Sequence, residues 1–246
     1  MLARVAVVGG VALLAGLSWA YTLVMPDMDR SMAEMAAAAG GHPWFGLEAV
    51  FTLLMWVAMM VAMMTPSALP MMLVFERIQR SRGLSSIRNT GAFLLGYFVL
   101  WTGFSLMATI AQAALHAFGL LSMGMRSADP VFSGLLLIAA GAYQLSPLKG
   151  ACLAGCRSPL AFVLAEWREG ILGALVMGLR HGAYCVGCCW LLMALLFVGG
   201  VMNPLWIGGL TAVVLLEKTL PIPRLAPVLG IGLAAWGVWL LVSTAP

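Results

Sequence analysis

The sequence predicts an all-α fold, a polytopic bundle of transmembrane helices with about seven spans. The first observation is composition, because 63% of the 246 residues are hydrophobic and only 9% are charged, whereas a soluble domain carries roughly 25% charged residues. The second is that the apolar residues form runs of about 18 residues or more, the length that crosses a hydrocarbon core of about 30 Å. We therefore expect residues 1–246 to form a single integral membrane domain surrounded by the lipid bilayer.

Seven apolar segments define the predicted spans. In chain order they are Val5–Val24, Leu47–Phe75, Thr90–Phe118, Val131–Gln144, Gly173–Val198, Leu205–Leu216 and Leu225–Val242. The fourth and sixth are short for a spanning helix, so we expect them to extend into their flanks or to bend. The first resembles a signal peptide, with Arg4 ahead of an apolar run, but it lacks a small-residue cleavage site and is predicted to stay as a helix.

The basic residues fall mainly on one side of the predicted spans. Eleven of the thirteen share that side, and only Arg30 and Arg126 lie on the other. By the positive-inside rule the crowded side is cytoplasmic, which predicts a cytoplasmic N-terminus and a C-terminus on the outer, periplasmic face of an inner (cytoplasmic) membrane. The basic residues flank apolar spans and form no separate basic domain, so the sequence excludes nucleic-acid binding. The eleven are Arg4, Arg77, Arg80, Arg82, Arg88, Lys149, Arg157, Arg168, Arg180, Lys218 and Arg224.

Two connections are long enough to carry function. Residues 26–46 form the predicted outward, Met-rich loop, and residues 146–170 form the predicted cytoplasmic, Cys-containing segment, in which Leu160–Arg168 favours a short interfacial helix. Methionines in a solvated loop have no core to fill, so we interpret them as candidates for metal capture; the alternative is an amphipathic helix lying on the lipid. They are Met25, Met28, Met32 and Met35, with Asp27, Asp29 and His42 nearby.

The fifth span carries the densest group of soft-metal ligands: His181, Cys185, Cys188 and Cys189. At about 100° per residue, the three cysteines fall within an arc of about 100° around His181, so one helix face carries all four side chains. Three thiols and an imidazole suit Cu(I) or Zn(II). The alternative is that these cysteines are small packing residues, but an ionisable group inside a membrane span indicates function.

The other two cysteines, Cys152 and Cys156, lie on the same predicted cytoplasmic side. Their spacing of four places both thiols on one face if the segment is helical. Because the cytoplasm keeps thiols reduced, a metal site or a transient redox pair is favoured over structural disulfides. Nearby Lys149 and Arg157 would stabilise thiolates. We expect helix packing to bring the two cysteine groups together.

Methionine supplies a second signal, with eighteen residues in the chain. On the second span, one row repeats every four residues and a second row lies about 100° away. Thioethers bind Cu(I) and largely ignore hard cations, so this ladder predicts an intramembrane path of weak sites. The alternative is adaptable packing at a helix interface. The first row is Met55, Met59 and Met63, and the second is Met60 and Met64, with Pro66 and Pro70 following.

Glu217 and Lys218 close the sixth span, and we interpret them as a pair at the lipid headgroups. The sequence contains no nucleotide-binding loop, nucleophile–base pair or Rossmann glycine signature. A role other than enzymatic catalysis is therefore favoured.

Three segments carry a resemblance to a known family: Met59-Met60 with Met63-Met64 and Pro66-Ser67; Tyr143-Gln144, Ser146-Pro147 and Lys149 before Cys152 and Cys156; and Gly178 with Arg180-His181-Gly182 before Cys185, Cys188, Cys189 and Trp190. On these residues the chain resembles bacterial predicted metal-binding integral membrane proteins, a domain of unknown function. The resemblance covers most of the chain beyond the first span and implies metal binding without implying a reaction. The methionine spacing is also similar to that of eukaryotic high-affinity copper transporters.

The leading hypothesis is a membrane protein that binds a soft metal, copper(I) in first place and zinc in second, for transport, delivery or storage. The cysteines with His181 would be the principal site, Cys152 and Cys156 an accessory pair, and the methionine ladder the path. Partners of this role would be another membrane protein or a metallochaperone, and an oligomer is compatible with it.

Two rival hypotheses remain open. A membrane thiol-disulfide oxidoreductase would cycle Cys185 and Cys188 and exchange with Cys152 and Cys156. A non-catalytic subunit of a larger membrane complex would use small residues, such as Gly199-Gly200 and Gly208-Gly209, for close helix contacts.

Overall fold

A computed structural model gives the structure of residues 2–38, 47–84, 86–122, 126–220, 222 and 224–244. Within these ranges there is no β-strand, apart from an isolated bridge between Leu121 and Ser127, so the predicted all-α class is confirmed. The helices are α1 (Leu2–Ala38), α2 (Leu47–Ser81), α3 (Ser86–Ala117), α4 (Pro130–Gln144), α5 (Pro147–Arg157), α6 (Pro159–Ala165), α7 (Gly170–Ala194), α8 (Leu196–Gly199), α9 (Pro204–Thr219) and α10 (Leu225–Ser243).

Every predicted span is helical in the structure, but the helices differ in length. Five described helices are long and apolar enough to cross a membrane, namely α1, α2, α3, α7 and α10. A sixth candidate is the pair α4 and α5, which together pass this test but meet at an angle of 64°. The predicted bend at the fourth span is therefore present, whereas α9 has only 16 residues, and the count of seven spans stays a prediction.

The two long connections contain more helix than the sequence suggested. α1 continues from the predicted first span to Ala38, so the backbone of the first half of the 26–46 loop is helical. Residues 39–46, together with the side chains of Met25, Met28, Met32 and Met35, lie outside what the structure describes. The 146–170 segment contains α5 and α6, and α6 overlaps the interfacial helix that was predicted there.

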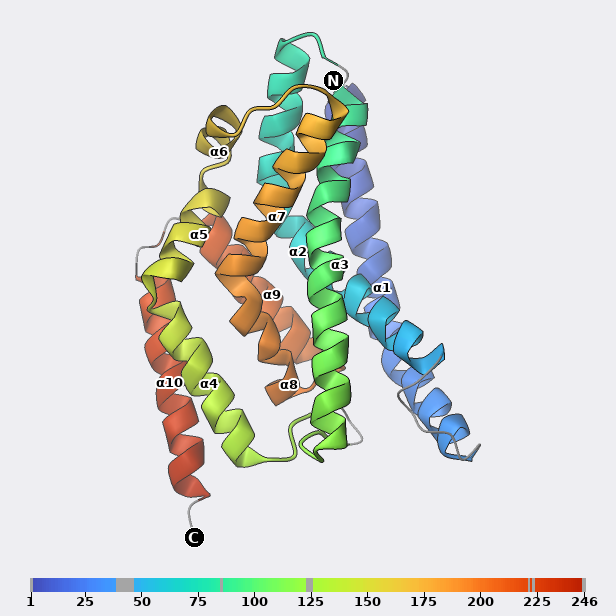
Figure 1. Ribbon diagram of the computed structural model, residues 1–246, viewed down its shortest axis with the longest axis vertical. Helices are drawn as coiled ribbons and strands as arrows, with labels where there is room; N and C mark the ends of the chain where they lie inside the picture. The colour runs from blue at the N-terminus through green and yellow to red at the C-terminus, as the bar shows by residue number, and fades with distance from the viewer. Residues whose placement is uncertain are drawn as a thin grey trace.

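Helix α7 occupies the centre of the bundle and contacts α3, α4, α5, α8 and α9. α1 packs on α2, α2 packs on α3, and α4 pairs with α10 (Figure 1). The start of α1 and the end of α10 lie at opposite ends of the molecule (Figure 1), as expected for an odd number of crossings. The bundle therefore places α7, with its cysteines, among helices that come from both halves of the sequence.

Glycines allow the closest helix contacts, and one of the four predicted for this role is among them, because a Cβ added at Gly199 would lie 2.3 Å from the ring of Trp206 on α9. Gly178 of α7 lies against the backbone of Phe93 on α3, and Gly96 of α3 lies against the backbone of α7. The pairing of α4 with α10 uses a similar device, because a Cβ added at Gly237 would lie 2.6 Å from the carbonyl oxygen of Gly134. Small residues are the usual means of close helix packing in membranes. A Cβ at Gly209, by contrast, would meet nothing within 4 Å.

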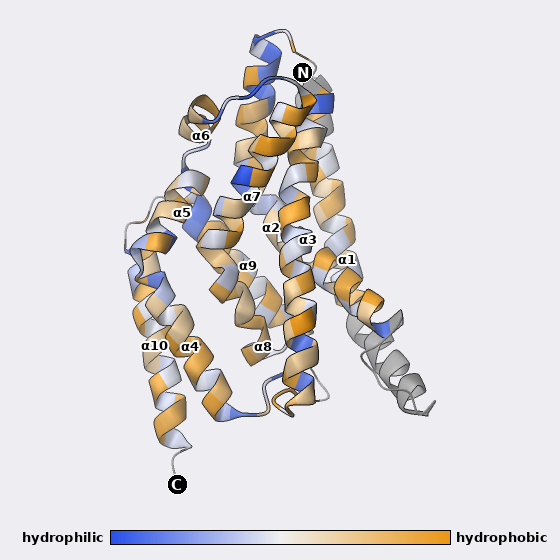
Figure 2. Ribbon diagram, in the orientation of Figure 1, coloured by the Kyte–Doolittle hydropathy of each residue, from blue (hydrophilic) through white to orange (hydrophobic). Residues whose placement is uncertain are grey.

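Hydrophilic residues collect at the α2–α3 turn and around α5 and α6, while the helix surfaces below are mostly apolar (Figure 2). At 1.5 Å per residue, the 35 residues of α2 extend about 52 Å, and the 19 residues of α10 extend about 28 Å. A hydrocarbon core of about 30 Å matches α10 and leaves one end of α2 beyond it. The end that carries Arg80 and Arg82 is therefore suited to water.

Candidate metal site

The predicted stripe on α7 faces the interior of the bundle. His181, Cys185, Cys188 and Cys189 are all buried, with at most 3% of any side chain exposed, whereas Tyr184 is 37% exposed. The thiols of Cys188 and Cys189 both donate to the carbonyl oxygen of Cys185, at 3.1 and 3.0 Å. One helix face therefore presents three sulfur atoms and an imidazole to the protein core, as the spacing predicted.

The second cysteine group reaches this face because the chain turns sharply after α4. Ser146 caps α5 by accepting a hydrogen bond from the backbone of Lys149 at 3.2 Å, and Pro147 occupies the first turn, where its missing N–H costs nothing. α5 then packs on α7. The Sγ atoms of Cys156 and Cys188 lie 4.0 Å apart. The expected meeting of the two cysteine groups is thus present.

Cys152 occupies the edge of this arrangement. Its side chain is only partly buried, and a Cβ added at Gly187 would lie 2.8 Å from its Sγ atom. α5 can pack this closely because α7 carries a glycine at that position. All five cysteines of the chain are free thiols in the structure. Cys156 therefore joins the α7 stripe, and Cys152 lies between the stripe and the protein surface.

The methionine ladder of α2 is buried in the same core as the thiols. The five side chains are at most 4% exposed and belong to one cluster with the α7 cysteines. Met64 makes the direct connection, because its Sδ atom lies 4.0 Å from the Sγ atom of Cys189. The ladder therefore ends at the thiols. The five methionines are Met55, Met59, Met60, Met63 and Met64.

Lys218 is a member of this site that the sequence did not indicate. The headgroup interpretation of Glu217 and Lys218 is wrong, because both side chains are buried, at 1% and 7% exposure. The Lys218 ammonium donates to the Cys185 sulfur at 2.8 Å and to the Ser67 hydroxyl at 3.3 Å. It also lies 3.9 Å from the sulfur of Met64. A positive charge therefore lies among the sulfur ligands.

Glu217 points in a different direction and holds α9 against α4 and α5. Its carboxylate pairs with Lys149 at 2.6 Å and accepts a hydrogen bond from Gln144 at 2.9 Å. The guanidinium of Arg157 donates to the backbone carbonyl of Glu217 at 2.6 Å. Lys149, expected to favour a cysteine thiolate, is thus neutralised by a carboxylate, and this network fixes the position of Cys156 and Lys218 together.

Aromatic rings surround the upper end of the stripe. His181 stacks on Phe93 and Tyr97, with ring centroids 5.9 and 5.6 Å apart, and meets the edge of Phe162. Its Nδ1 atom is buried without a hydrogen-bond partner among the described residues. The Tyr97 hydroxyl lies 3.1 Å from the Cys185 sulfur. An orphaned imidazole nitrogen is uncommon in a protein interior, and metal ligation is one way to satisfy it.

The buried side chains described above do not form a complete set of metal ligands. Over the described ranges, no three side chains drawn from His, Cys, Asp and Glu are placed to hold a metal ion together. Pairs of sulfur atoms fit a metal ion better. Two metal–sulfur bonds of about 2.3 Å that meet at about 120° place their sulfur atoms about 4.0 Å apart. Cys156 with Cys188 and Cys189 with Met64 both have this separation. Each of these sulfur pairs could therefore bind one soft metal ion.

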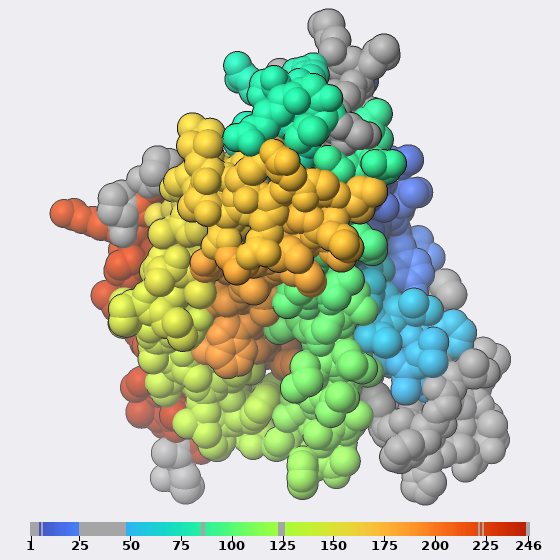
Figure 3. Space-filling model, turned by 45° about the horizontal axis from the view of Figure 1, so that its top comes forward, coloured from blue at the N-terminus to red at the C-terminus, as the bar shows by residue number. Residues whose placement is uncertain are grey.

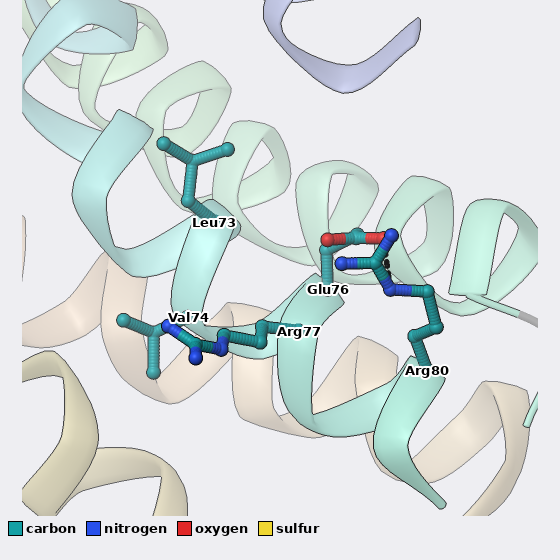
Figure 4. Close-up of a pocket in the computed structure, with 5 residues that line it drawn as sticks. All are labelled: Leu73, Val74, Glu76, Arg77 and Arg80. Atoms are coloured by element: carbon teal, nitrogen blue, oxygen red, sulfur yellow. Dashed lines mark ion pairs between the residues drawn. The ribbon is translucent and has the colours of Figure 1, made fainter. Parts of the chain in front are cut away.

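The sulfur cluster lies inside the protein, away from the open surface. In Figure 3, α6 and the start of α7 form a continuous cover over the end of the bundle beside the α2–α3 turn. A surface pocket of about 370 Å³ on α2 is lined by Leu73, Val74, Glu76, Arg77 and Arg80. It contains no sulfur ligand, and Arg80 faces Glu76 across it at 3.8 Å (Figure 4). This pocket is separate from the metal site.

The fold and the site together define a class of protein: an all-helical bundle with helices of membrane-spanning length and a sulfur-rich cluster in its interior. Residues 53–240 match the family PpoB2, described as a copper chaperone. The chain belongs to this copper chaperone family, which supports a role in copper binding or delivery. The match includes all three segments on which the metal-binding resemblance rests. Copper, the metal placed first, is confirmed at the level of the family.

Comparison with curated proteins and with solved structures gives no match.

Proposed function

We propose that this protein is an integral membrane chaperone that binds copper(I) in the bundle interior and delivers it to another protein. The principal ligands are the thiolates of Cys156 and Cys188, with His181 and Met64 as neutral donors, and Cys185 accepts the hydrogen bond of Lys218. Copper is cargo in this role, so the ion must be both bound and released. Family membership supports copper handling, and the apolar helices are consistent with a membrane location.

The observation that carries the proposal is the approach of Cys156 to Cys188 across two helices, with Sγ atoms 4.0 Å apart. A thiol pair from separate helices can hold one ion while the helices move slightly apart to release it. Thiolate and thioether ligands select Cu(I). Zinc, which prefers four ligands in a closed tetrahedron, is served less well by the described arrangement.

The location of the site suits delivery on the cytoplasmic side. Arg80 lies in the last turn of α2, and Arg82 lies 4.0 Å from Glu169, the residue that directly precedes α7. These arginines are therefore at the end of the bundle where α7 begins, and α6, which follows α5, lies toward the same end (Figure 1). By the positive-inside rule we assign this end to the cytoplasm of a bacterial inner membrane. The methionine ladder then leads from the membrane interior to the thiols. A metallochaperone or a second membrane protein would exchange copper near α5.

Metal analysis of the purified protein tests this proposal. The protein in detergent is loaded with Cu(I) under anaerobic, reducing conditions, passed through a desalting column and analysed for copper and zinc. We expect about one tightly held copper per chain in the wild type and a loss of most of it in Cys188→Ser and Cys156→Ser. Met72→Leu, which changes an equally buried methionine of α2, is the matched control and keeps its copper.

The oxidoreductase hypothesis predicts a different result in the same preparations. Cys188→Ala would accumulate a mixed disulfide with a substrate protein, detectable on a non-reducing gel, and copper would be absent from the wild type. Absence of copper from the wild type refutes the chaperone proposal.

A further inference from the structure

Lys218 has an unusual position for a lysine in a membrane protein. Its side chain is 7% exposed, and its ammonium contacts the sulfur of Cys185 at 2.8 Å. Burying a charge inside a membrane protein is expensive, and such groups pair with others or mark functional sites. The ammonium therefore requires a counter-charge close by.

The neighbouring carboxylates do not provide that counter-charge. Over the residues that the structure describes, no carboxylate lies within ion-pair distance of Lys218. Glu217, the adjacent residue, is already paired with Lys149 at 2.6 Å, so those two charges cancel. The Lys218 charge is left facing sulfur: Cys185 directly, and Met64 at 3.9 Å.

We propose that the positive charge of Lys218 makes the sulfur site selective for a monovalent metal ion over a divalent one. This inference rests on the proposed function. Two thiolate ligands carry two negative charges, and the Lys218 ammonium cancels one of them. A single Cu⁺ then makes the buried site neutral. A Zn²⁺ in the same site leaves one uncompensated positive charge in a medium of low dielectric constant, which is costly.

Lys218 plays this part without binding the metal. An ammonium has three N–H donors and no lone pair, so it acts through its charge and its hydrogen bonds to Cys185 and Ser67. The methionine and histidine donors are neutral and leave the charge count unchanged. At an effective dielectric constant of about 20, a unit charge a few ångströms from the metal changes its binding by at least about tenfold. Because the repulsion between the ammonium and a bound cation grows with the charge of the cation, Lys218 disfavours Zn²⁺ by about twice the free energy by which it disfavours Cu⁺.

The experiment measures dissociation constants for Cu(I) and Zn(II) by competition with calibrated chelators, on full-length protein in detergent. Lys218→Met removes the charge and keeps the length of the side chain. We expect the affinities for both ions to rise, that for Zn(II) by the larger factor, so that the preference for Cu(I) over Zn(II) falls at least about tenfold. Lys218→Arg keeps the charge and should keep the wild-type preference. Lys218→Gln supplies a second neutral side chain if the methionine variant does not fold.

The matched control removes an exposed basic residue and its acidic partner without changing the net charge. Arg82→Met combined with Glu169→Gln eliminates one positive and one negative charge of a surface pair 4.0 Å apart, so the ratio of the two dissociation constants should stay that of the wild type. A ratio that is unchanged in Lys218→Met, or that shifts toward Cu(I), would overturn the inference while copper binding by the wild type upheld the proposed function. A wild type that binds no copper overturns both.

Discussion

The attachment of α10 to the bundle depends on two glycines, and one substitution tests this. Among the described residues of α10, only Gly230 and Gly237 are buried. In Gly237→Ala the new methyl group would lie 2.6 Å from the carbonyl oxygen of Gly134, whereas ordinary contacts begin at 3.4 Å. Because the methyl position is fixed by the α10 backbone and the oxygen belongs to the α4 backbone, α10 must move away from α4 by about 0.8 Å, and close packing tolerates such shifts poorly.

The size of the effect follows from this overlap. Overpacking typically costs about 1–3 kcal/mol, and each kcal/mol lowers the melting temperature of a protein of 150–250 residues by roughly 2–4 °C. We therefore expect Gly237→Ala to lower the midpoint of thermal unfolding by about 2–12 °C. Tryptophan fluorescence during heating in detergent measures this midpoint, because Trp236 and Trp239 are on α10 itself.

Gly232→Ala is the matched control on the same helix. A Cβ added at Gly232 meets nothing within 4 Å, and alanine is favoured over glycine in a helix by up to about 1 kcal/mol. Its unfolding midpoint should equal or exceed that of the wild type. If Gly237→Ala unfolds at the same temperature as Gly232→Ala, the close contact between α4 and α10 does not hold α10 in place, and the reasoning fails.

Three further predictions concern the ion pair, the accessible thiol and the methionine ladder. Lys149→Met should destabilise the protein by about 3–5 kcal/mol because it leaves a buried carboxylate unpaired, and adding Glu217→Gln should recover most of this loss in thermal unfolding. Cys152, the partly exposed thiol, should react first with a maleimide, and mass spectrometry should find one modified cysteine before any other; rapid labelling of several would contradict the burial. Met64→Leu should lower copper affinity, measured by chelator competition, whereas Met72→Leu should leave it unchanged, and equal effects would remove the special role of Met64.

Helix positions were predictable from the sequence because hydrophobicity alone decides which segments leave water. The predicted fourth span, Val131–Gln144, agrees with α4 to one residue, since Asp129 caps the helix by accepting a hydrogen bond at 2.8 Å and Pro130 begins it. The helical backbone of α1 as far as Ala38 agrees with the alternative given for this segment, an amphipathic helix. The prediction of a span at α9 stays untested, because its 16 residues are short for a spanning helix.

The cysteines of the candidate site were predictable from the sequence, including the meeting of Cys156 with the α7 group, but the charged member was not. The α7 stripe followed from helix geometry, and the face carrying Cys185 and Cys188 is buried as expected. Lys218 was missed because a charged residue at a helix end usually lies at the headgroups, and only packing against α7 brings its ammonium to Cys185. The sequence does contain a signal for Lys218. The chain has only one other lysine, Lys149, and Lys218 ends a short predicted span.

The break between α4 and α5 explains why Cys156 can join the α7 stripe, and it supplies the last prediction. Ser146 and Pro147 turn the chain by 64°. If α5 continued straight from α4, Cys156, ten residues further on, would lie about 16 Å from its present position, given a rise of about 1.5 Å per residue. The Lys149–Glu217 ion pair, in the first turn of α5, also opposes that straightening.

Replacing both Ser146 and Pro147 with alanine should therefore weaken the contact without abolishing it, and adding Glu217→Gln should abolish it. Oxidative cross-linking of Cys156 to Cys188, whose sulfurs lie 4.0 Å apart, measures the contact, and copper retention should fall in the same order. Cross-linking that is as fast in the combined variant as in the wild type would mean that neither the turn nor the ion pair positions Cys156. The packing of α5 on α7, with Gly187 against Cys152, would then be the cause.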